Sequence, residues 1–526
     1  MDSSRSPLLL VCKEKQPQQP HAILFPLPAQ GHVIPFLNLA RLLASKGIAV
    51  SFVCAEHRIS LLRTDQSLLT NPLIHLVGLP ERVPPRESDT DEVYDSFIWL
   101  FDVADSMKDD FVKFVKLHRS TAAATDVFTH PNYGAPDCII ADPFLSWINN
   151  VASNLSIPLY TFYTSPCWSL TTSFYIPILT SEAVLPLRSS AQPQLMSFPG
   201  LPPLWDTDLF HFVRDVVPAR LRNGLLNFGL VLSQSSRILL NTTYEIESGN
   251  IDALENEDPY KTNFKIQPIG PLLPSELLDK DHVQHSLQSK PETSEVRDCL
   301  EWLNTQSPAS VLYVSFGSIY VPSDDEIIEI AHGLEASTHN FLWVLRPPPC
   351  DNSQNEHSWL SRVLPPGFQS RTHSRGFILP HWAPQLLILS SPSIGGFFTH
   401  CGWNSILESI CCGVPLLAYP RFAEQRLNCR MIVDQLKLGI ELETNELEGL
   451  PERNAVERAV RSVMEGEESQ KIRREVRESR KRMKTAVKEN GSSNRNVEAI
   501  VQEIFHFFDH KLDNANINIW PHGKTK

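Results

Sequence analysis

The sequence predicts an α/β protein with two doubly wound parallel-sheet domains. Short apolar runs typical of strands alternate with amphipathic helical runs twice, once before residue 241 and again after residue 299. At 526 residues the chain is too long for one ordinary core and suits two domains of about 250 residues each. Between them, residues 268–295 are rich in Pro, Ser and Gln and lack periodicity, which is typical of a linker. We therefore expect a first domain at 21–267 and a second at 296–493.

The first domain opens with a strand, a helix and a strand, which form a βαβ unit and so indicate a parallel sheet. These elements are predicted at 22–27, 33–44 and 48–54; later strands are predicted at 138–141, 158–162 and 237–241, with a helix at 147–155. The first turn lacks the GxGxxG pattern of dinucleotide-binding proteins. It places a histidine, His32, at the mouth of the sheet instead.

The second domain repeats the alternation. A run at 299–303 opens it; strands are predicted at 310–315, 341–345 and 376–379, and a helix at 324–335. From residue 452 to 488 the chain is highly charged with helical periodicity, which is typical of helices with one solvated face.

One stretch organises the second domain. Residues 394–399 are typical of a buried strand, the turn His-Cys-Gly-Trp-Asn-Ser follows at 400–405, and a helical run begins at 406. A helix N-terminus offers free N–H groups and the positive end of a dipole, which suits a phosphate. Glu408, one turn into the helix, can accept hydrogen bonds from a sugar diol, and Trp382 offers a flat face to a base. The pattern predicts a nucleotide pocket.

Composition excludes several other classes of protein. The net charge of −13 argues against nucleic acid and anionic membranes as partners. The ten cysteines are scattered without the paired spacing of metal sites, which indicates a reducing compartment. The apolar run at 8–11 is too short for a signal peptide, and no stretch approaches the ~18 apolar residues of a membrane span. We expect a cytoplasmic protein.

Residues 382–425 resemble the 44-position signature box of the plant UDP-dependent glycosyltransferases that modify small metabolites (glycosyltransferase family one). Trp stands first, Gln fourth, His-Cys-Gly-Trp-Asn-Ser in the middle and Glu-Gln last. The resemblance covers roughly residues 20–510 and implies the GT-B architecture, in which two Rossmann-like domains face a cleft. It also implies a last helix at about 494–508 that returns to the first domain. A disordered tail at 1–20 and a polar tail at 510–526 fall outside it.

The resemblance assigns roles to residues on the donor side. UDP would contact Ser318, Trp382, Ala383, Gln385, His400, Gly402, Asn404, Ser405 and Glu408, and the sugar would contact Thr164, Trp403, Glu424 and Gln425. Tyr419 and Arg421 stand where many members have Trp and an aliphatic residue. We expect Arg421 to be exposed; the alternative is that it favours an acidic sugar.

In the first domain, residues 26–35 (PLPAQGHVIP) resemble the family's loop for the catalytic base, which implies that His32 removes the proton of an acceptor hydroxyl. Asp142, after the strand at 138–141, would accept a hydrogen bond from the other ring nitrogen. The Asp-Pro-Phe triplet at 142–144 is also similar to that of some C-glycosyltransferases. Thr164 follows Asp142 by 22 positions, as in the O-glycosylating relatives.

We expect neither a metal nor another cofactor. Two Asp-x-Asp triplets, at 89–91 and 206–208, resemble the metal-binding triplet of a different transferase fold, but both lie in Pro-rich segments and are expected to be surface acids. The segments 80–135 and 185–215, which include Trp99, Phe101, Trp205 and Phe212, are expected to be surface loops over the core. The alternative is that they wall an apolar acceptor pocket.

The sequence therefore predicts an inverting, metal-independent and monomeric enzyme. The expected partners are UDP-glucose, or another UDP-sugar, and a small phenolic, flavonoid or terpenoid acceptor; Trp403 and Gln425 favour glucose. C-transfer to a phenolic ring and a non-catalytic UDP-sugar-binding protein remain alternatives. A serine hydrolase is disfavoured because no Gly-x-Ser-x-Gly elbow occurs.

Overall fold

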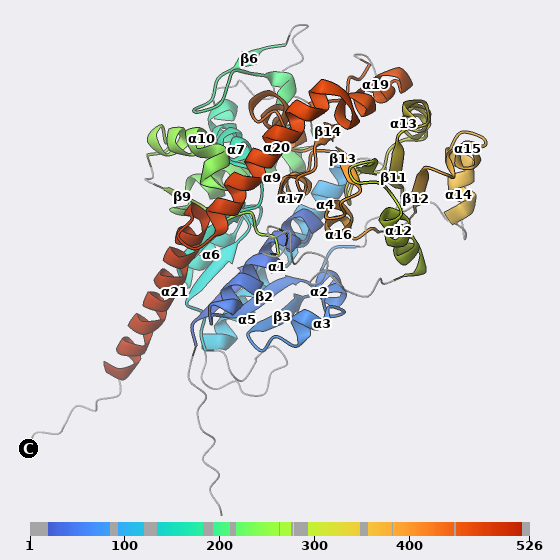
Figure 1. The fold of residues 1–526 in the computed structure, drawn as a ribbon. Coiled ribbons are helices and arrows are strands. Elements are labelled where there is room, and N and C mark those ends of the chain that lie inside the picture. The colour runs from blue at the N-terminus through green and yellow to red at the C-terminus, as the bar shows by residue number, and fades with distance from the viewer. Residues whose placement is uncertain are drawn as a thin grey trace, which may run out of the picture.

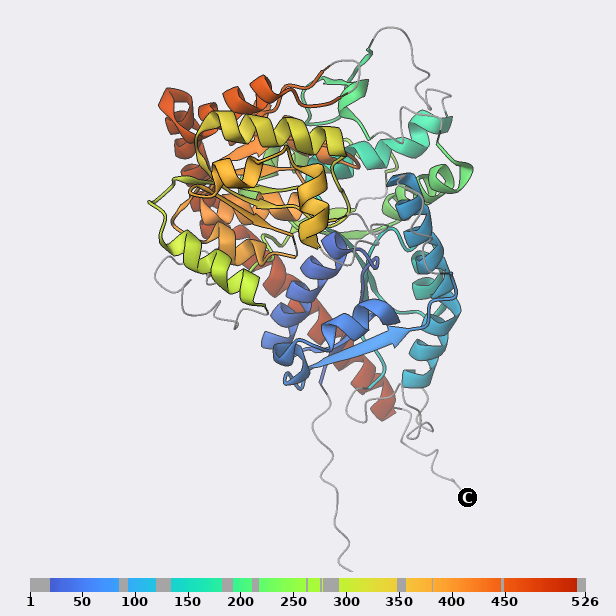
Figure 2. The same cartoon turned by 90° about the vertical axis from the view of Figure 1, so that its right-hand side faces the viewer.

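The structure of the protein, a computed structural model, describes residues 19–84, 93–119, 134–181, 193–210, 217–261, 264–274, 277, 293–347, 356–380, 382–445 and 449–517. Two parallel sheets with packed helices form two domains that lie side by side (Figure 2), and the predicted fold class is confirmed. Residues 1–18 of the expected N-terminal tail and 278–292 of the expected linker lie outside the described residues.

The first sheet has seven strands in the order β3-β2-β1-β4-β5-β8-β9, and every neighbouring pair is parallel. Its strands are β1 (His21–Phe25), β2 (Ala49–Ala55), β3 (Ile74–Leu79), β4 (Cys138–Ala141), β5 (Leu159–Tyr163), β8 (Arg237–Leu240) and β9 (Lys265–Pro268). The five predicted strands agree within two residues. The edge strands β3 and β9 were not predicted, because both carry exposed or polar positions that dilute a strand pattern.

The helices of the first domain are α1 (Gln30–Ser45), α2 (Glu56–Leu62), α3 (Gln66–Leu69), α4 (Val93–Ser106), α5 (Lys108–Arg119), α6 (Ile148–Asn154), α7 (Cys167–Ser181), α9 (Ala219–Ser233) and α10 (Tyr244–Asn256). A small hairpin, β6 (Leu195–Met196) with β7 (Leu204–Trp205), leads into the 3₁₀ turn η1 (Asp206–Asp208). The expectation of loops at 93–119 is wrong. The prolines of that region lie outside 86–130, so no proline interrupts a helix there. The apolar residues recur at helical spacing, and the fold buries Leu100, Val103, Ala104 and Met107.

The second sheet has six parallel strands in the order β12-β11-β10-β13-β14-β15. They are β10 (Val311–Ser315), β11 (Asn340–Val344), β12 (Gly376–Leu379), β13 (Ile394–Thr399), β14 (Leu416–Ala418) and β15 (Gly439–Glu441). The accompanying helices are α12 (Ser294–Asn304), α13 (Asp324–Ser337), α14 (Glu356–Val363), α15 (Phe368–Thr372), α16 (Gln385–Leu389), α17 (Trp403–Cys412), α18 (Gln425–Arg430) with the π turn η3 (Met431–Gln435), α19 (Arg453–Met464) and α20 (Gly466–Val487).

The last helix, α21 (Ser492–Ile517), returns to the first domain. Figure 1 shows α20 and α21 passing in succession from the second domain along the side of the first. Val497, Ile500 and Ile504 of α21 are buried in the core of the first domain. The helix extends nine residues past the expected end at 508, so residues 510–517 of the expected polar tail continue the helix. Lys511 explains part of this extension, because its ammonium donates to the Asp137 carboxylate at 2.9 Å.

A shared apolar cluster joins the domains, since Trp168 and Leu221 of the first domain belong to the same buried cluster as Trp403 and Ile406 of the second. The expectation that Asp208 is a surface acid is wrong. Its carboxylate is buried and accepts a hydrogen bond at 2.9 Å from Arg430 Nε of the second domain. Asp208 therefore forms an ion pair between the two domains. The other triplet, 89–91, lies outside the described residues.

None of the helices in the described part of the chain combines the length and the apolar composition needed to cross a membrane.

We predict that Ile504→Ala lowers the free energy of unfolding of the first domain by about 2–5 kcal/mol, because it leaves a cavity beneath α21. Urea unfolding followed by circular dichroism measures this loss. Gln502→Ala, an exposed position on the same helix, is the matched control and is expected to stay within about 0.5 kcal/mol of the wild type. An equal loss in both variants would contradict the packing of α21 on the first domain.

Candidate functional site

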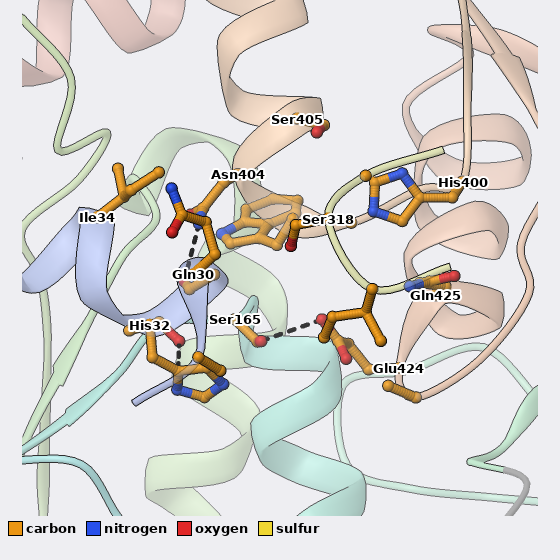
Figure 3. Close-up of a pocket in the computed structure, with 18 of the residues that line it drawn as sticks. Gln30, His32, Ile34, Ser165, Ser318, His400, Asn404, Ser405, Glu424 and Gln425 are labelled. Carbon is orange, nitrogen blue, oxygen red and sulfur yellow. Dashed lines mark hydrogen bonds between the residues drawn. The ribbon is translucent and has the colours of Figure 1, made fainter. Parts of the chain in front are cut away.

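A cavity of about 550 Å³ lies between the two domains, and all the predicted site residues except Asp142 line it. The side chains reach it from both domains: Figure 3 shows His32 and Ser165 of the first domain and Ser318, His400, Glu424 and Gln425 of the second around one space. The structure thus brings together residues that are up to about 390 positions apart in the sequence.

The topology explains this convergence. The strand order reverses between β1 and β4 in the first sheet and between β10 and β13 in the second. At such a point the loops diverge to opposite faces of the sheet and leave a crevice outside the carboxyl ends of the strands, where ligands bind. His32 follows β1 and Asp142 follows β4, whereas Ser318 follows β10 and His400 follows β13. Both crevices contribute to the same cavity.

His32 and Asp142 form a hydrogen-bonded pair. Nδ1 of His32 lies 2.6 Å from Asp142 Oδ2, and the buried carboxylate also accepts a hydrogen bond from Phe144 N at 3.0 Å. Because a carboxylate only accepts, Nδ1 carries the proton and Nε2 is left with the lone pair. Burial alone lowers the pKa of His32, but the charge and hydrogen bond of Asp142, with a smaller effect of Glu424, raise it above its ordinary 6.5.

Aromatic rings form the wall next to His32. The Phe144 ring meets the imidazole edge-on at 5.6 Å, and it stacks on Phe228 at 4.2 Å and on Phe101 at 5.6 Å. Further apolar side chains continue this wall: Phe97, Leu100, Ile176, Phe210, Leu221 and Leu225. This end of the cavity suits the apolar body of a small molecule whose polar group points to Nε2 of His32. Of the aromatic residues noted in the sequence, Phe101 lines the cavity, Trp99 and Trp205 do not, and Phe212 lies outside the described residues.

The first turn of α1 is joined to the second domain. Pro35 lies inside α1 and has no N–H, so it cannot bond the carbonyl of Gly31 four residues earlier. That carbonyl accepts a hydrogen bond at 2.8 Å from Asn404 Nδ2, at the start of α17. The helix begins at Gln30 rather than at the predicted 33, so His32 stands in its first turn and not in a preceding loop.

His400 lies at the N-terminus of α17, where two glycines allow its close approach. A Cβ at Gly317 or at Gly402 would lie 2.5 Å from His400 Nε2, so a larger residue at either position would displace the ring. Burial, with a contribution from the charge of Arg346, lowers the pKa of His400 to about 4, and the ring is neutral near pH 7. Its Nδ1 is buried without a hydrogen-bond partner. An unpaired ring nitrogen beside free helix N–H groups is suited to an incoming anion.

Next to this helix end lies a polar network. Gln385 Nε2 donates to Ser405 Oγ at 2.9 Å and to Glu408 Oε2 at 2.7 Å. Burial raises the pKa of Glu408 to about 7, although the bond from Gln385 opposes the shift. Trp382 is 51% exposed and offers its ring to the cavity, with the guanidinium of Arg346 5.9 Å from the ring centroid. Ala383 and Gly402 also line this part of the cavity.

The four residues predicted to contact the sugar differ in how far their polar atoms are already bonded within the protein. Glu424 Oε1 accepts a hydrogen bond from Ser165 Oγ across the domains at 3.2 Å, and Thr164 Oγ1 lies 3.4 Å from His32 Nδ1. Gln425 Oε1 already accepts from the backbone N–H groups of Arg421 and Phe422 at 3.0 and 3.1 Å, which leaves its NH₂ group for a ligand. The indole N–H of Trp403 donates to the Asn241 carbonyl at 2.7 Å and is therefore occupied by the protein.

The expectation that Arg421 is exposed is wrong. Its side chain is 22% exposed and pairs with the buried carboxylate of Glu326 at 2.9 Å. The guanidinium also lies over the rings of Tyr419 and Tyr320, at 4.6 and 5.1 Å from their centroids. Because its charge is matched by Glu326 and Arg421 does not line the cavity, the alternative of a contact with an acidic sugar finds no support in this geometry.

Several cavity residues were not predicted. Arg346 follows β11 and donates to the Gly317 carbonyl at 2.6 Å, while Ser165 and Phe144 sit beside the predicted Thr164 and Asp142. Their only sequence signal is their position just after a strand, which many ordinary residues share. Among the described residues, no three His, Cys, Asp or Glu side chains are grouped so that they could hold a metal ion.

Comparisons with known proteins all point to one family. A family model described as UDP-glucoronosyl and UDP-glucosyl transferase matches residues 269–473. The 7-deoxyloganetin glucosyltransferase of Gardenia jasminoides is 31% identical over 503 residues, which cover 92% of this chain and 98% of that protein.

Two solved structures share the fold over most of both chains. One is Phytolacca americana UGT2 complexed with UDP-2fluoro-glucose and pterostilbene, at 29% identity and a TM-score of 0.74, covering 93% of this chain and 100% of that one. The other is Medicago truncatula UGT71G1 complexed with UDP-glucose, at 25% identity and a TM-score of 0.77, covering 92% and 98%. Together with the two facing parallel sheets, these likenesses show that the chain belongs to the plant UDP-dependent glycosyltransferases (glycosyltransferase family one) and is an enzyme of the GT-B fold.

Proposed function

We propose that this enzyme moves glucose from UDP-glucose to a hydroxyl of a small lipophilic plant metabolite, with inversion at the anomeric carbon. The observation that carries the proposal is one cavity with two chemically different ends. The His32–Asp142 pair lies beside an aromatic wall at one end, and the α17 N-terminus with its neutral His400 lies at the other. A base and an anion site on opposite sides of one space suit a displacement between them.

In the proposed reaction His32 is the general base. Nε2 takes the proton of the acceptor hydroxyl as its oxygen bonds to the anomeric carbon, and the bond from that carbon to the UDP oxygen breaks. Asp142 holds the Nδ1–H tautomer and stabilises the imidazolium that forms, as in other His–carboxylate pairs. Attack from the first domain and departure of UDP into the second are opposite in direction, which gives inversion.

The second domain would hold the donor. Trp382 would stack on uracil with Ala383 and Gln385 beside it, and Glu408 would accept hydrogen bonds from the ribose hydroxyls. Ser318, His400, Gly402, Asn404 and Ser405 would surround the diphosphate, and the α17 dipole with Arg346 would offset the charge that develops on UDP. Thr164, Trp403, Glu424 and Gln425 would surround the glucose. We propose that no metal takes part.

The apolar wall around Phe144 supports a lipophilic acceptor, since ring-on-ring contacts favour flat or fused hydrocarbon skeletons. Two relatives point the same way: one is named a glucosyltransferase of 7-deoxyloganetin, and another was solved with pterostilbene. The eight cysteines in the described part of the chain are all unpaired, which supports our proposal of a reducing, cytoplasmic setting. We further propose that the enzyme acts as a monomer.

A donor-by-acceptor screen by mass spectrometry, with EDTA and without added metal, tests this function. UDP-glucose, UDP-galactose and UDP-glucuronate would each be offered with phenols, flavonoids and terpenols. We expect a hexose-shifted product from UDP-glucose, and His32→Ala is expected to reduce its rate by about 10²- to 10⁴-fold while UDP still binds. Acid hydrolysis of the product distinguishes an O-glucoside from an acid-stable C-glucoside. Tight UDP binding with no product from any pair would contradict the proposal and favour a non-catalytic protein.

The pH dependence of kcat/KM reports on the base. His32 must be unprotonated to act, so the rate falls as pH decreases through its raised pKa, and the acid limb of the wild type is expected above pH 6.5. Asp142→Asn removes the carboxylate charge that raises the pKa of His32, whereas burial still lowers that pKa. The acid limb is therefore expected to move to lower pH. The plateau rate should also fall by at least about tenfold, because the tautomer is no longer held.

Glu424→Gln is the comparison for this experiment. Glu424 has the smaller effect on His32, so its variant should shift the acid limb in the same direction by less. An acid limb that stays in place in Asp142→Asn would mean that a group other than His32 titrates.

Trp382→Ala tests the base-stacking position. Loss of one base–aromatic stack is expected to weaken UDP binding by about 1–3 kcal/mol, measured by isothermal titration calorimetry. Trp205→Ala is the matched control, because Trp205 is exposed to nearly the same extent, 49% against 51%, but lies outside the cavity. Equal UDP affinity in the two variants would exclude stacking on Trp382.

A further inference from the structure

A buried ion pair lies behind the loop that carries Glu424 and Gln425. The Glu326 carboxylate, at the first turn of α13, accepts hydrogen bonds from Tyr320 Oη at 2.6 and 2.7 Å and from Tyr419 Oη at 2.5 Å. It also pairs with Arg421 at 2.9 Å and caps the helix through Ser323 N at 2.8 Å. Its side chain is 3% exposed, so each of these partners offsets a large desolvation cost.

Arg421 is the cation of this cluster, and its contacts are directional. One Nη meets Glu326, the other donates to the Gly449 carbonyl at 3.1 Å, and the guanidinium plane lies over the rings of Tyr419 and Tyr320. A planar, forked cation satisfies these demands together, whereas a lysine ammonium does not.

The cluster connects two segments that line the donor end of the cavity. Tyr320 belongs to the segment that carries Gly317 and Ser318, whereas Tyr419 and Arg421 open the loop that leads to Glu424 and Gln425. The backbone N–H of Arg421 itself donates to Gln425 Oε1 at 3.0 Å. Ala423, within this loop, has a φ of +52°, a conformation that a residue with a Cβ keeps only when its surroundings impose it.

We propose that Arg421 is a positioning residue: through Glu326, Tyr320 and Tyr419 it holds residues 419–425 in the shape that turns Gln425 and Glu424 toward the donor sugar, and it thereby sets the choice among UDP-hexoses without touching them. This inference rests on the proposed function, because it assigns a role in recognition of the sugar that is transferred.

Steady-state kinetics with UDP-glucose and UDP-galactose, together with UDP binding, test the proposal. We expect Arg421→Leu to raise KM for UDP-glucose roughly tenfold and to reduce the preference for UDP-glucose over UDP-galactose, because small displacements of a positioned group carry costs of this order. Affinity for UDP, which lacks the sugar, should stay within a factor of about two. Arg421→Lys should restore part of the preference, since it returns the charge without the fork.

Two further variants keep the test interpretable. Arg371→Leu removes an exposed arginine that pairs with Glu335 at the opposite end of α13, and it should change neither KM nor sugar preference. If Arg421→Leu fails to fold because Glu326 is left unpaired, the double variant Glu326→Gln/Arg421→Gln removes both charges and should show the same rise in KM and loss of preference.

Three outcomes would overturn the inference. One is unchanged KM and sugar preference in Arg421→Leu. Another is a loss of UDP affinity equal to the rise in KM, which would indicate general damage to the donor site. The third is a selective loss of transfer from UDP-glucuronate, which would indicate direct reading of an acidic sugar. Absence of transfer by the wild type from every donor would refute the proposed function instead, so the two failures are distinguishable.

Discussion

The architecture depends on one constraint of parallel sheets: functional side chains collect where the strand order reverses, outside the carboxyl ends of the strands. Each of the two sheets of this chain has one such reversal, and the two crevices face each other across the cavity. The reversal between β1 and β4 places His32 beside Asp142, and the reversal between β10 and β13 places Ser318 beside His400. The first crevice holds the hydrogen-bonded His32–Asp142 pair and the second holds the N-terminus of α17 with His400, so the cavity acquires its two chemically different ends only when the domains face each other.

Polar contacts at the cavity wall, as well as the shared apolar cluster, hold the two domains in their facing arrangement. Asn404 uses the Gly31 carbonyl that Pro35 leaves free, Glu424 accepts from Ser165, and Trp403 donates to Asn241. Away from the cavity, Asp208 and Arg430 form a partly buried ion pair between the domains. Because several site residues also make these contacts, the geometry of the site and the closure of the domains are coupled.

The buried titratable groups differ in the partners that the protein supplies to them. Asp142, Asp208 and Glu326 each have a cationic or hydrogen-bonding partner that offsets their desolvation. His400 and Glu408 are different, since burial displaces the pKa of one to about 4 and of the other to about 7. Both line the cavity, where Nδ1 of His400 has no hydrogen-bond partner and one oxygen of Glu408 accepts a hydrogen bond from Gln385.

The sequence by itself determined the order and type of most elements, since a strand period and a helix period are local properties of the chain. It also indicated many of the residues that line one end of the cavity, because the signature at 382–425 is contiguous and its cavity residues lie in or just before α16, α17 and α18. The tertiary structure decided what depends on distant partners. Arg421 and Asp208 were expected at the surface, and only Glu326 and Arg430, far away in sequence, explain their burial. The aromatic wall around Phe144 draws on α4 and α9, which share no local pattern with it. Local periodicity records which way a residue faces, whereas the partner it meets is set by how the elements pack.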